Sequence, residues 1–218
     1  MINAFELQSG RLKQIQIESK ADLERTQPIW IDFDEPTDEE RLWAKELFKL
    51  TLPDEDDFGD IEASARCFED ATGALQIRSD FLLDSTHESR NVPVAFVLKK
   101  DILFSLHEED LPAFRLLRMR ARHQPGYLEN SRDLLLDLYA TDVEYSADSL
   151  EEIYANLEQI GNRTLKAHLS DETAAEVLAS IAGEEDLNGR IRRNLMDTRR
   201  AISFLMRRRL LSAEQIED

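Results

Sequence analysis

The second half of the chain carries two long stretches in which apolar residues recur every three or four positions. The first stretch runs over residues 127–167 and the second over residues 171–211. This spacing is typical of helices that pack side by side and differs from the alternation of a strand. The residues at this spacing are Leu136, Tyr139, Val143, Leu150, Ile153, Leu157 and Ile160 in the first stretch and Ala174, Val177, Ile181, Ile191, Leu195, Thr198, Ile202 and Leu205 in the second.

These two stretches predict a long antiparallel helical hairpin. At 1.5 Å per residue each helix would be about 60 Å long, roughly twice the diameter of a small domain. The outer part of each helix therefore cannot rest on the rest of the chain, and the two helices must cover each other. Ser170 is a suitable N-cap after the polar turn between them. The alternative is a compact bundle in which the helices kink at Gly161 and Gly183.

The first half of the chain alternates short strand patterns with helix signals. Thr37 and Glu40 form a capping box that opens one helix, and Pro112 stands in the first turn of another. The pattern predicts a mixed sheet with helices packed on it, an α+β (mixed α/β sandwich) domain over residues 1–123 followed by the hairpin over 127–211. The predicted strands cover residues 4–8, 12–17, 29–33, 65–69, 75–83, 92–98 and 102–106.

Composition narrows the class of protein. The chain has 45 acidic and 27 basic residues and a net charge of -18, which disfavours contact with nucleic acids. No stretch reaches the roughly 18 apolar residues that a membrane span needs, and the N-terminus lacks a secretion signal. The single cysteine, Cys67, excludes an internal disulfide. We therefore expect a soluble chain in a reducing compartment.

Sequence motifs of catalysis are absent. The chain has no glycine-rich phosphate loop, no H-E-x-x-H and no C-x-x-C. The four histidines, His87, His107, His123 and His168, have no metal-ligand spacing, and we expect each to be a surface or turn residue. We therefore expect no enzyme. Carboxylates remain, and Mg2+ binds through oxygen ligands, of which only one or two need be carboxylates.

Six strings of residues, in order along the chain, carry a family resemblance. They cover residues 60–70, 94–96, 103–106, 111–122, 134–138 and 195–201. They resemble the cytoplasmic N-terminal domain of the CorA family of magnesium transporters. The resemblance extends over nearly the whole chain.

The resemblance implies the cytoplasmic regulatory domain of a homopentameric transporter or channel for Mg2+, in some members also for Co2+ or Ni2+. Such a domain lies at the cytoplasmic face of the inner or plasma membrane. Residues 212–218 would begin a truncated stalk segment, and the membrane helices would follow it. In that family, Mg2+ between neighbouring subunits holds the pore closed, and its loss opens the pore. A cation between acidic subunits offsets their repulsion.

The resemblance also implies two metal-binding positions. Asp60 matches the aspartate of the family's interface site, whose partner would lie beyond residue 218. Asp137 matches the helix member of a neighbouring site, but Gly59 stands where that site has its other acid. Asp60 and Asp137 are therefore the predicted metal ligands.

Two other functions remain open at this stage. A relative that transports zinc or cobalt could share the same soluble domain, because this domain does not contain the selectivity region. A stand-alone protein could instead use the hairpin as an interaction arm, with no metal and no membrane.

Overall fold

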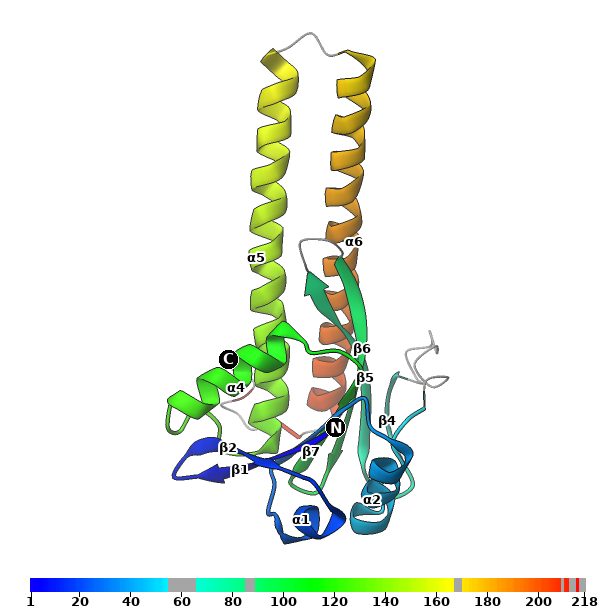
Figure 1. Cartoon of the computed structure of the whole chain (residues 1–218), viewed down its shortest axis with the longest axis vertical. Coiled ribbons are helices and arrows are strands. Elements are labelled where there is room, and N and C mark those ends of the chain that lie inside the picture. The colour runs from blue at the N-terminus through cyan, green and yellow to red at the C-terminus, as the bar shows by residue number, and fades with distance from the viewer. Residues whose placement is uncertain (55–65, 85–88, 167–169, 209, 212–214, 216–218) are drawn as a thin grey trace.

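A mixed sheet forms the body of the protein, and two long helices project from it, as Figure 1 shows for the computed structural model. The structure describes residues 1–54, 66–84, 89–166, 170–208, 210–211 and 215. The sheet has seven strands in the order β2-β1-β3-β7-β6-β5-β4. The strands are β1 (Ile2–Gln8), β2 (Arg11–Gln16), β3 (Trp30–Asp34), β4 (Cys67–Glu69), β5 (Leu75–Asp84), β6 (Ser89–Lys99) and β7 (Ile102–His107).

Most strands pair with a neighbour along the chain. The pairs β1–β2, β5–β6 and β6–β7 are antiparallel neighbours along the chain, and β3 pairs with β7 in parallel. Trp30 lies opposite Leu103 in this parallel pair, so the centre of the sheet joins distant parts of the sequence. All seven predicted strands are present.

Helices cover both faces of the sheet. On one face lie α1 (Lys20–Arg25) and α2 (Asp38–Phe48), whose apolar residues share a core with Ile31, Phe33 and Phe104. On the other face lie α4 (Pro112–His123) and the lower parts of α5 (Ser131–Lys166) and α6 (Asp171–Arg207). That second core contains Phe96 and Phe114, and it continues from α4 into α5. The division into domains after residue 123 stays a prediction.

Local side-chain chemistry sets the helix ends. The capping box of Thr37 and Glu40 is present at the start of α2, and the Ser170 side chain accepts a hydrogen bond of 3.2 Å from the backbone N–H of Thr173. The helix α5 begins at Ser131, later than expected, because the Asn130 side chain caps it by accepting from the backbone N–H groups of residues 132 and 133. The short helix α1 was not predicted, because six residues hold too little of the helical period.

The segment before α5 is held against the first hairpin. The backbone N–H of Gly126 donates to the carbonyl of Gly10 at 2.7 Å. Both glycines have positive φ, and a Cβ on Gly10 would lie 3.0 Å from the Gly126 nitrogen. This close approach therefore requires glycine at position 10.

The predicted antiparallel hairpin is confirmed, and the kinked bundle is wrong. Both helices continue through Gly161 and Gly183, where the space around each Cα is open, so neither glycine breaks its helix. The hairpin extends well beyond the sheet (Figure 1). None of the described helices has an apolar stretch long enough to cross a membrane.

The two helices cover each other only in part. Ile153 and Ile191 are the outermost buried residues, and none of the described residues between them is buried. Asn156 and Glu184 place a polar hydrogen bond of 3.0 Å between the helices. Large apolar side chains stay exposed at separate positions along the two helices, and we call the following set of residues the outer strip: Val143, Tyr154, Leu157, Leu178, Ile181 and Leu195.

Candidate functional site

Of the two predicted metal ligands, Asp60 lies outside the described residues, as does Gly59 beside it. Its role stays a prediction. Asp137 is described and lies in the second turn of α5.

Asp137 is held by a neighbouring tyrosine. The Tyr127 hydroxyl lies 2.8 and 2.7 Å from the two carboxylate oxygens of Asp137 and donates to them. Burial raises the pKa of Asp137, and the nearby Glu144 raises it further, while the Tyr127 hydrogen bond and Arg120 act in the opposite direction. Arg120 itself pairs with Glu144 at 2.6 Å. Asp137 is thus a half-buried carboxylate with an increased affinity for protons.

Asp137 faces an open groove of about 600 Å³ between α5 and α6. Asp133, Asp137 and Glu144 supply acidic groups on the α5 side, and Thr198 and Ile202 line the α6 side. Within the part of the chain that the structure describes, no three acidic, histidine or cysteine side chains are grouped closely enough to bind a metal. A cation at Asp137 would therefore complete its coordination with water, with the remaining residues or with a second subunit.

A second polar cluster, which was not predicted, lies where the hairpin leaves the sheet. Asp142 of α5 is 1% exposed. Its carboxylate accepts 3.1 Å from the backbone N–H of Leu82 in β5 and 2.8 Å from the Asn194 amide in α6. Burial raises the pKa of Asp142 to about 7, although the hydrogen bond from Leu82 acts against this shift. One carboxyl group thus connects three elements.

A periodic signal for this cluster existed in the sequence. Asp142 continues the row of buried positions that runs along α5 toward the sheet: Leu135, Leu138, Asp142, Ser146, Ser149 and Ile153. The predicted apolar stripe passed over the three polar members and took Val143 and Leu157 instead, which the structure leaves exposed. The polar side chains in this buried row therefore led to the wrong prediction that the row faces solvent.

The expectation for His107 is wrong. His107 is 2% exposed, and its Nε2 atom lies 3.0 Å from Asp32 Oδ1. Ser105 and Arg118 also donate to Asp32, at 2.5 and 3.3 Å. Burial lowers the pKa of His107, but the Asp32 carboxylate and then Asp34 outweigh it, so the pKa is raised overall. The sequence around His107, at the end of β7, does not indicate that the side chain is buried. The residues that surround it come from β3 and α4. His123 is exposed as expected, and the other two histidines lie outside the described residues.

Comparisons with known proteins agree on one family. The sequence profile described as "CorA-like Mg2+ transporter protein" matches residues 25–218. The magnesium transport protein CorA of Escherichia coli K12 is 42% identical over 218 residues, which are 100% of this chain and 68% of the relative. The protein of the same name from Salmonella typhimurium is 41% identical over the same span, again 68% of the relative.

Solved structures share the fold. The soluble domain of CorA from Methanocaldococcus jannaschii superposes with a TM-score of 0.75 at 18% identity, covering 100% of this chain and 84% of that one. The cytoplasmic domain of ZntB from Vibrio parahaemolyticus gives a TM-score of 0.58 at 12% identity, covering 93% and 88%. At these identities the likeness shows the fold alone.

Proposed function

The chain belongs to the CorA-like Mg2+ transporter family, and we propose that it is the regulatory domain on the cytoplasmic side of such a transporter. The observation that carries the proposal is the 42% identity to the Escherichia coli magnesium transport protein along the whole chain. The complete transporter would be a homopentamer that carries Mg2+, with Co2+ or Ni2+ as further cargo.

Regulation would come from Mg2+ at the contacts between subunits. The net charge of -18 makes identical subunits repel one another, and a divalent cation between their carboxylates offsets that repulsion. We propose Asp60 and Asp137 as ligands of such cations. When cytosolic Mg2+ falls, the cations would leave and the subunits would move apart, which opens the pore.

The environment of Asp137 supports competition between Mg2+ and protons. Its pKa is raised, and a metal ion binds only the deprotonated carboxylate. The Tyr127 hydroxyl already contacts both oxygens, so a cation would have to share or displace that hydrogen bond. Binding at Asp137 is therefore expected to strengthen as the pH rises.

The hairpin would transmit this change as a lever. Its outer strip leaves large apolar side chains in water, with Tyr154 and Leu178 each 67% exposed. We infer that the complete assembly covers these side chains. The ZntB likeness is one of fold alone, whereas the 42% identity along the whole chain is to a magnesium transport protein, so the magnesium transporter is the better-supported function.

A chimera tests the proposal. The matching part of the Escherichia coli relative is replaced by this chain, and the chimera is expressed in a strain that lacks Mg2+ uptake systems. We expect growth at low Mg2+, close to that given by the relative itself. A chimera that inserts in the membrane at normal levels but supports no growth would contradict the proposal.

A further inference from the structure

The described carboxylates that line the groove between α5 and α6 already have donors within this chain. Asp137 accepts from the Tyr127 hydroxyl, and Glu144 pairs with Arg120 at 2.6 Å. Asp133 accepts hydrogen bonds of 3.1 and 2.8 Å from the turn before α5. A cation that enters this groove therefore has to replace protein donors before it can bind a carboxylate oxygen.

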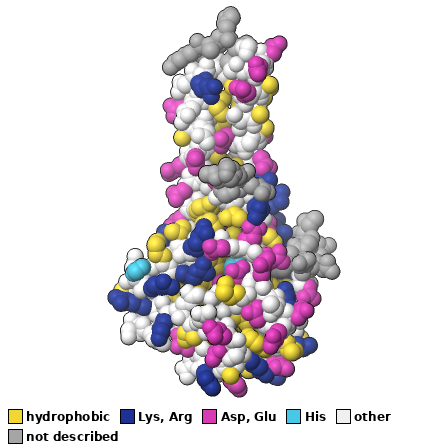
Figure 2. Space-filling view, in the orientation of Figure 1, with side chains coloured by type: hydrophobic (Ala, Val, Ile, Leu, Met, Phe, Trp, Pro, Cys, Tyr) yellow, Lys and Arg dark blue, Asp and Glu magenta, His cyan; other side chains and the backbone are white. Residues whose placement is uncertain are grey.

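The Tyr127 hydroxyl covers the binding direction of Asp137. It lies 2.8 and 2.7 Å from the two carboxylate oxygens, so it stands between them, where a cation held by both oxygens would lie. The positive charge of Arg120 also acts on this carboxylate. Figure 2 shows Lys and Arg side chains over α4, the helix that carries Arg120. A cation at Asp137 therefore competes with one hydroxyl proton and with a resident positive charge.

Tyr127 lies in the connection between α4 and α5, residues 124–130. The neighbouring Gly126 donates its backbone N–H to the Gly10 carbonyl at 2.7 Å, which joins the connection to the turn between β1 and β2. The hydrogen bond from Tyr127 to Asp137 joins the same connection to the second turn of α5. The connection thus lies between the sheet and the base of the hairpin, and movement of Tyr127 changes how the two are held together.

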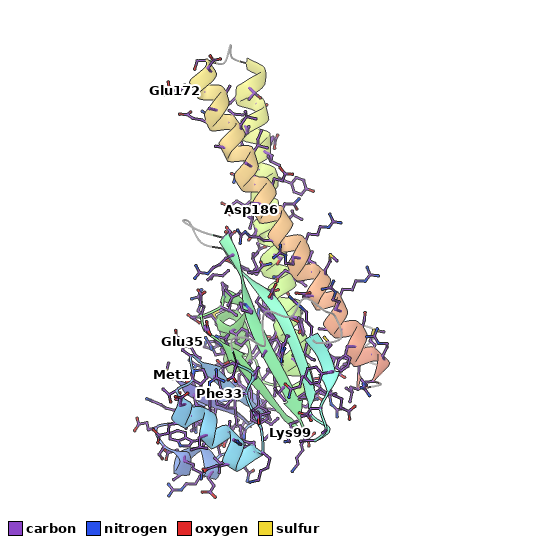
Figure 3. All side chains as sticks on the ribbon, turned by 90° about the vertical axis from the view of Figure 1, so that its right-hand side faces the viewer. Met1, Phe33, Glu35, Lys99, Glu172 and Asp186 are labelled. Atoms are coloured by element: carbon purple, nitrogen blue, oxygen red, sulfur yellow. The ribbon has the colours of Figure 1, made fainter. Side chains whose placement is uncertain are left out.

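The length of the hairpin enlarges a change at its base. Figure 3 shows how far Glu172, near the outer end of the hairpin, lies from Glu35 on the body. The helix α5 has 36 residues and is therefore about 54 Å long. At this length, a tilt of about 5° at the start of α5 moves its far end by about 5 Å. A single hydrogen bond at the base can therefore influence the position of the tip.

We propose that Tyr127 competes with Mg2+ for the Asp137 carboxylate. Binding of the cation breaks the Tyr127–Asp137 hydrogen bond, loosens the connection between α4 and α5 and lets the hairpin tilt. Mg2+ takes oxygen ligands and keeps several waters, for which the groove of about 600 Å³ leaves space. Tyr127 is thus a positioning residue that lowers the affinity for Mg2+ and links the site to the hairpin. This inference rests on the proposed function, because it specifies how a cation at Asp137 acts on the rest of the domain.

Removal of the hydroxyl tests the competition. In the chimera, Tyr127→Phe should lower the Mg2+ concentration that half-protects the domain from limited proteolysis by about three- to tenfold, the range for the loss of one competing hydrogen bond. The matched control is Tyr145→Phe, which removes a hydroxyl that donates to the backbone carbonyl of Asp84 at 2.7 Å. This control should leave the concentration unchanged. An unchanged or raised concentration in Tyr127→Phe, or an equal fall in both variants, would overturn the proposal.

A double variant tests whether Tyr127 acts through Asp137. Tyr127→Phe is combined with Asp137→Asn, which leaves no carboxylate for the hydroxyl to cover. The double variant should therefore need the same Mg2+ concentration for half-protection as Asp137→Asn alone. A further several-fold fall in the double variant would show that Tyr127 acts on a different site, and the proposal would be wrong.

A change outside the groove tests the link to the connection. A Cβ on Gly10 would lie 3.0 Å from the Gly126 nitrogen, so Gly10→Ala should shift the connection and weaken the Tyr127–Asp137 hydrogen bond. We expect the half-protective Mg2+ concentration to fall, as in Tyr127→Phe. Gly73→Ala is the control, because Gly73 also has positive φ but a Cβ there approaches only a side-chain atom, at 3.9 Å. Equal responses of the two glycine variants would speak against the proposal.

Hydrogen exchange measures the connection directly. Mg2+ should speed amide exchange of residues 124–130 in the chimera and should have no such effect in its Tyr127→Phe variant, which lacks the hydrogen bond from the start. Slower or unchanged exchange in the unmutated chimera would overturn the proposal. A chimera that neither grows at low Mg2+ nor gains protection from Mg2+ defeats the proposed function as well. A growing, protected chimera whose Tyr127→Phe variant behaves in the same way defeats only this inference.

Discussion

Asp142 of α5 and Asn194 of α6 join the two long helices through a buried hydrogen bond of 2.8 Å. The two residues are 1% and 0% exposed. Asp142 also accepts from the backbone of Leu82, so the base of the hairpin is tied to the sheet through one carboxyl group. Charge at this group therefore affects how firmly the hairpin is held.

Stability should fall as Asp142 ionises. Its pKa is about 7 in the folded protein, above the ordinary value of 3.8. Below the ordinary pKa, the Asp142 carboxyl is protonated in both the folded and the unfolded protein. Between the two pKa values only the folded protein keeps this proton, and above pH 7 the carboxyl is ionised in both. The free energy of unfolding contributed by Asp142 therefore decreases from pH 4 to pH 7, by at most about 4 kcal/mol. Urea unfolding of the wild type and Asp142→Asn at several pH values measures the difference, and a pH-independent difference would contradict this.

Removing the Asn194 amide should destabilise the junction. Asn194→Ala takes a donor from Asp142 and leaves a carboxylate oxygen buried without its partner, at a cost of about 1–3 kcal/mol. The cost should be larger at pH 8 than at pH 5, where Asp142 is protonated. Asn188→Ala, exposed on the same helix, is the control and should cost little. Equal losses in the two variants would show that the hydrogen bond contributes nothing specific.

The His107–Asp32 pair should stabilise the body most at low pH. Because the pKa of His107 is raised, its contribution is complete below the unfolded value near 6.5 and is lost as the pH rises through the folded value. His107→Gln should cost about 3 kcal/mol by breaking a buried pair, whereas the exposed His123→Gln should cost almost nothing. Proton NMR of the His107 ring should show a midpoint above 6.5. A midpoint below 6.5 would show that Asp32 does not raise the pKa of His107.

Asp137 should set the response to Mg2+. In the chimera, Asp137→Asn removes a charged ligand, so more Mg2+ should be needed to protect the domain from limited proteolysis. We expect the half-protective concentration to rise several-fold. Asp148 is an exposed acid on the same helix. Asp148→Asn makes the same change in charge and is expected to leave the response unchanged. If both variants shift equally, net charge and not a site at Asp137 controls the response.

The outer strip should matter for function and little for folding. Tyr154→Ser and Leu178→Ser replace exposed side chains, so each should change the stability of the isolated chain by less than about 0.5 kcal/mol. In the chimera the same changes should reduce growth at low Mg2+. The neighbouring Ile153→Ala empties a buried position and should cost about 2–5 kcal/mol in the isolated chain. Normal growth of the strip variants would argue against a covered surface.

Much of the fold was predictable because its signals are local. The caps at Thr37 and Ser170 and the alternation in the strands depend on neighbours within a few residues. Helical spacing placed Asp142 in a row with buried positions of α5, but its partners could not be predicted, because they come from β5 and α6, which the local sequence does not reveal. His107 was misplaced for the same reason.

The candidate site depended on resemblance more than on pattern. Composition indicated only that carboxylates were available. The strings of residues that resemble the family pointed to Asp60 and Asp137. The structure adds that the Tyr127 hydroxyl donates to the Asp137 carboxylate. Periodicity could not supply that contact, because Tyr127 lies before the helix that carries Asp137.

The parallel pairing of β3 with β7 has a consequence for biosynthesis. Trp30 of β3 meets Ser105 of β7, its hydrogen-bond partner 75 positions later in the chain. During translation the first three strands can pair with one another, but the other edge of β3 stays unpaired until β7 has left the ribosome. An unpaired apolar strand edge invites association with other nascent chains. Slow translation between these two strands should therefore increase aggregation of the newly made protein and its dependence on chaperones.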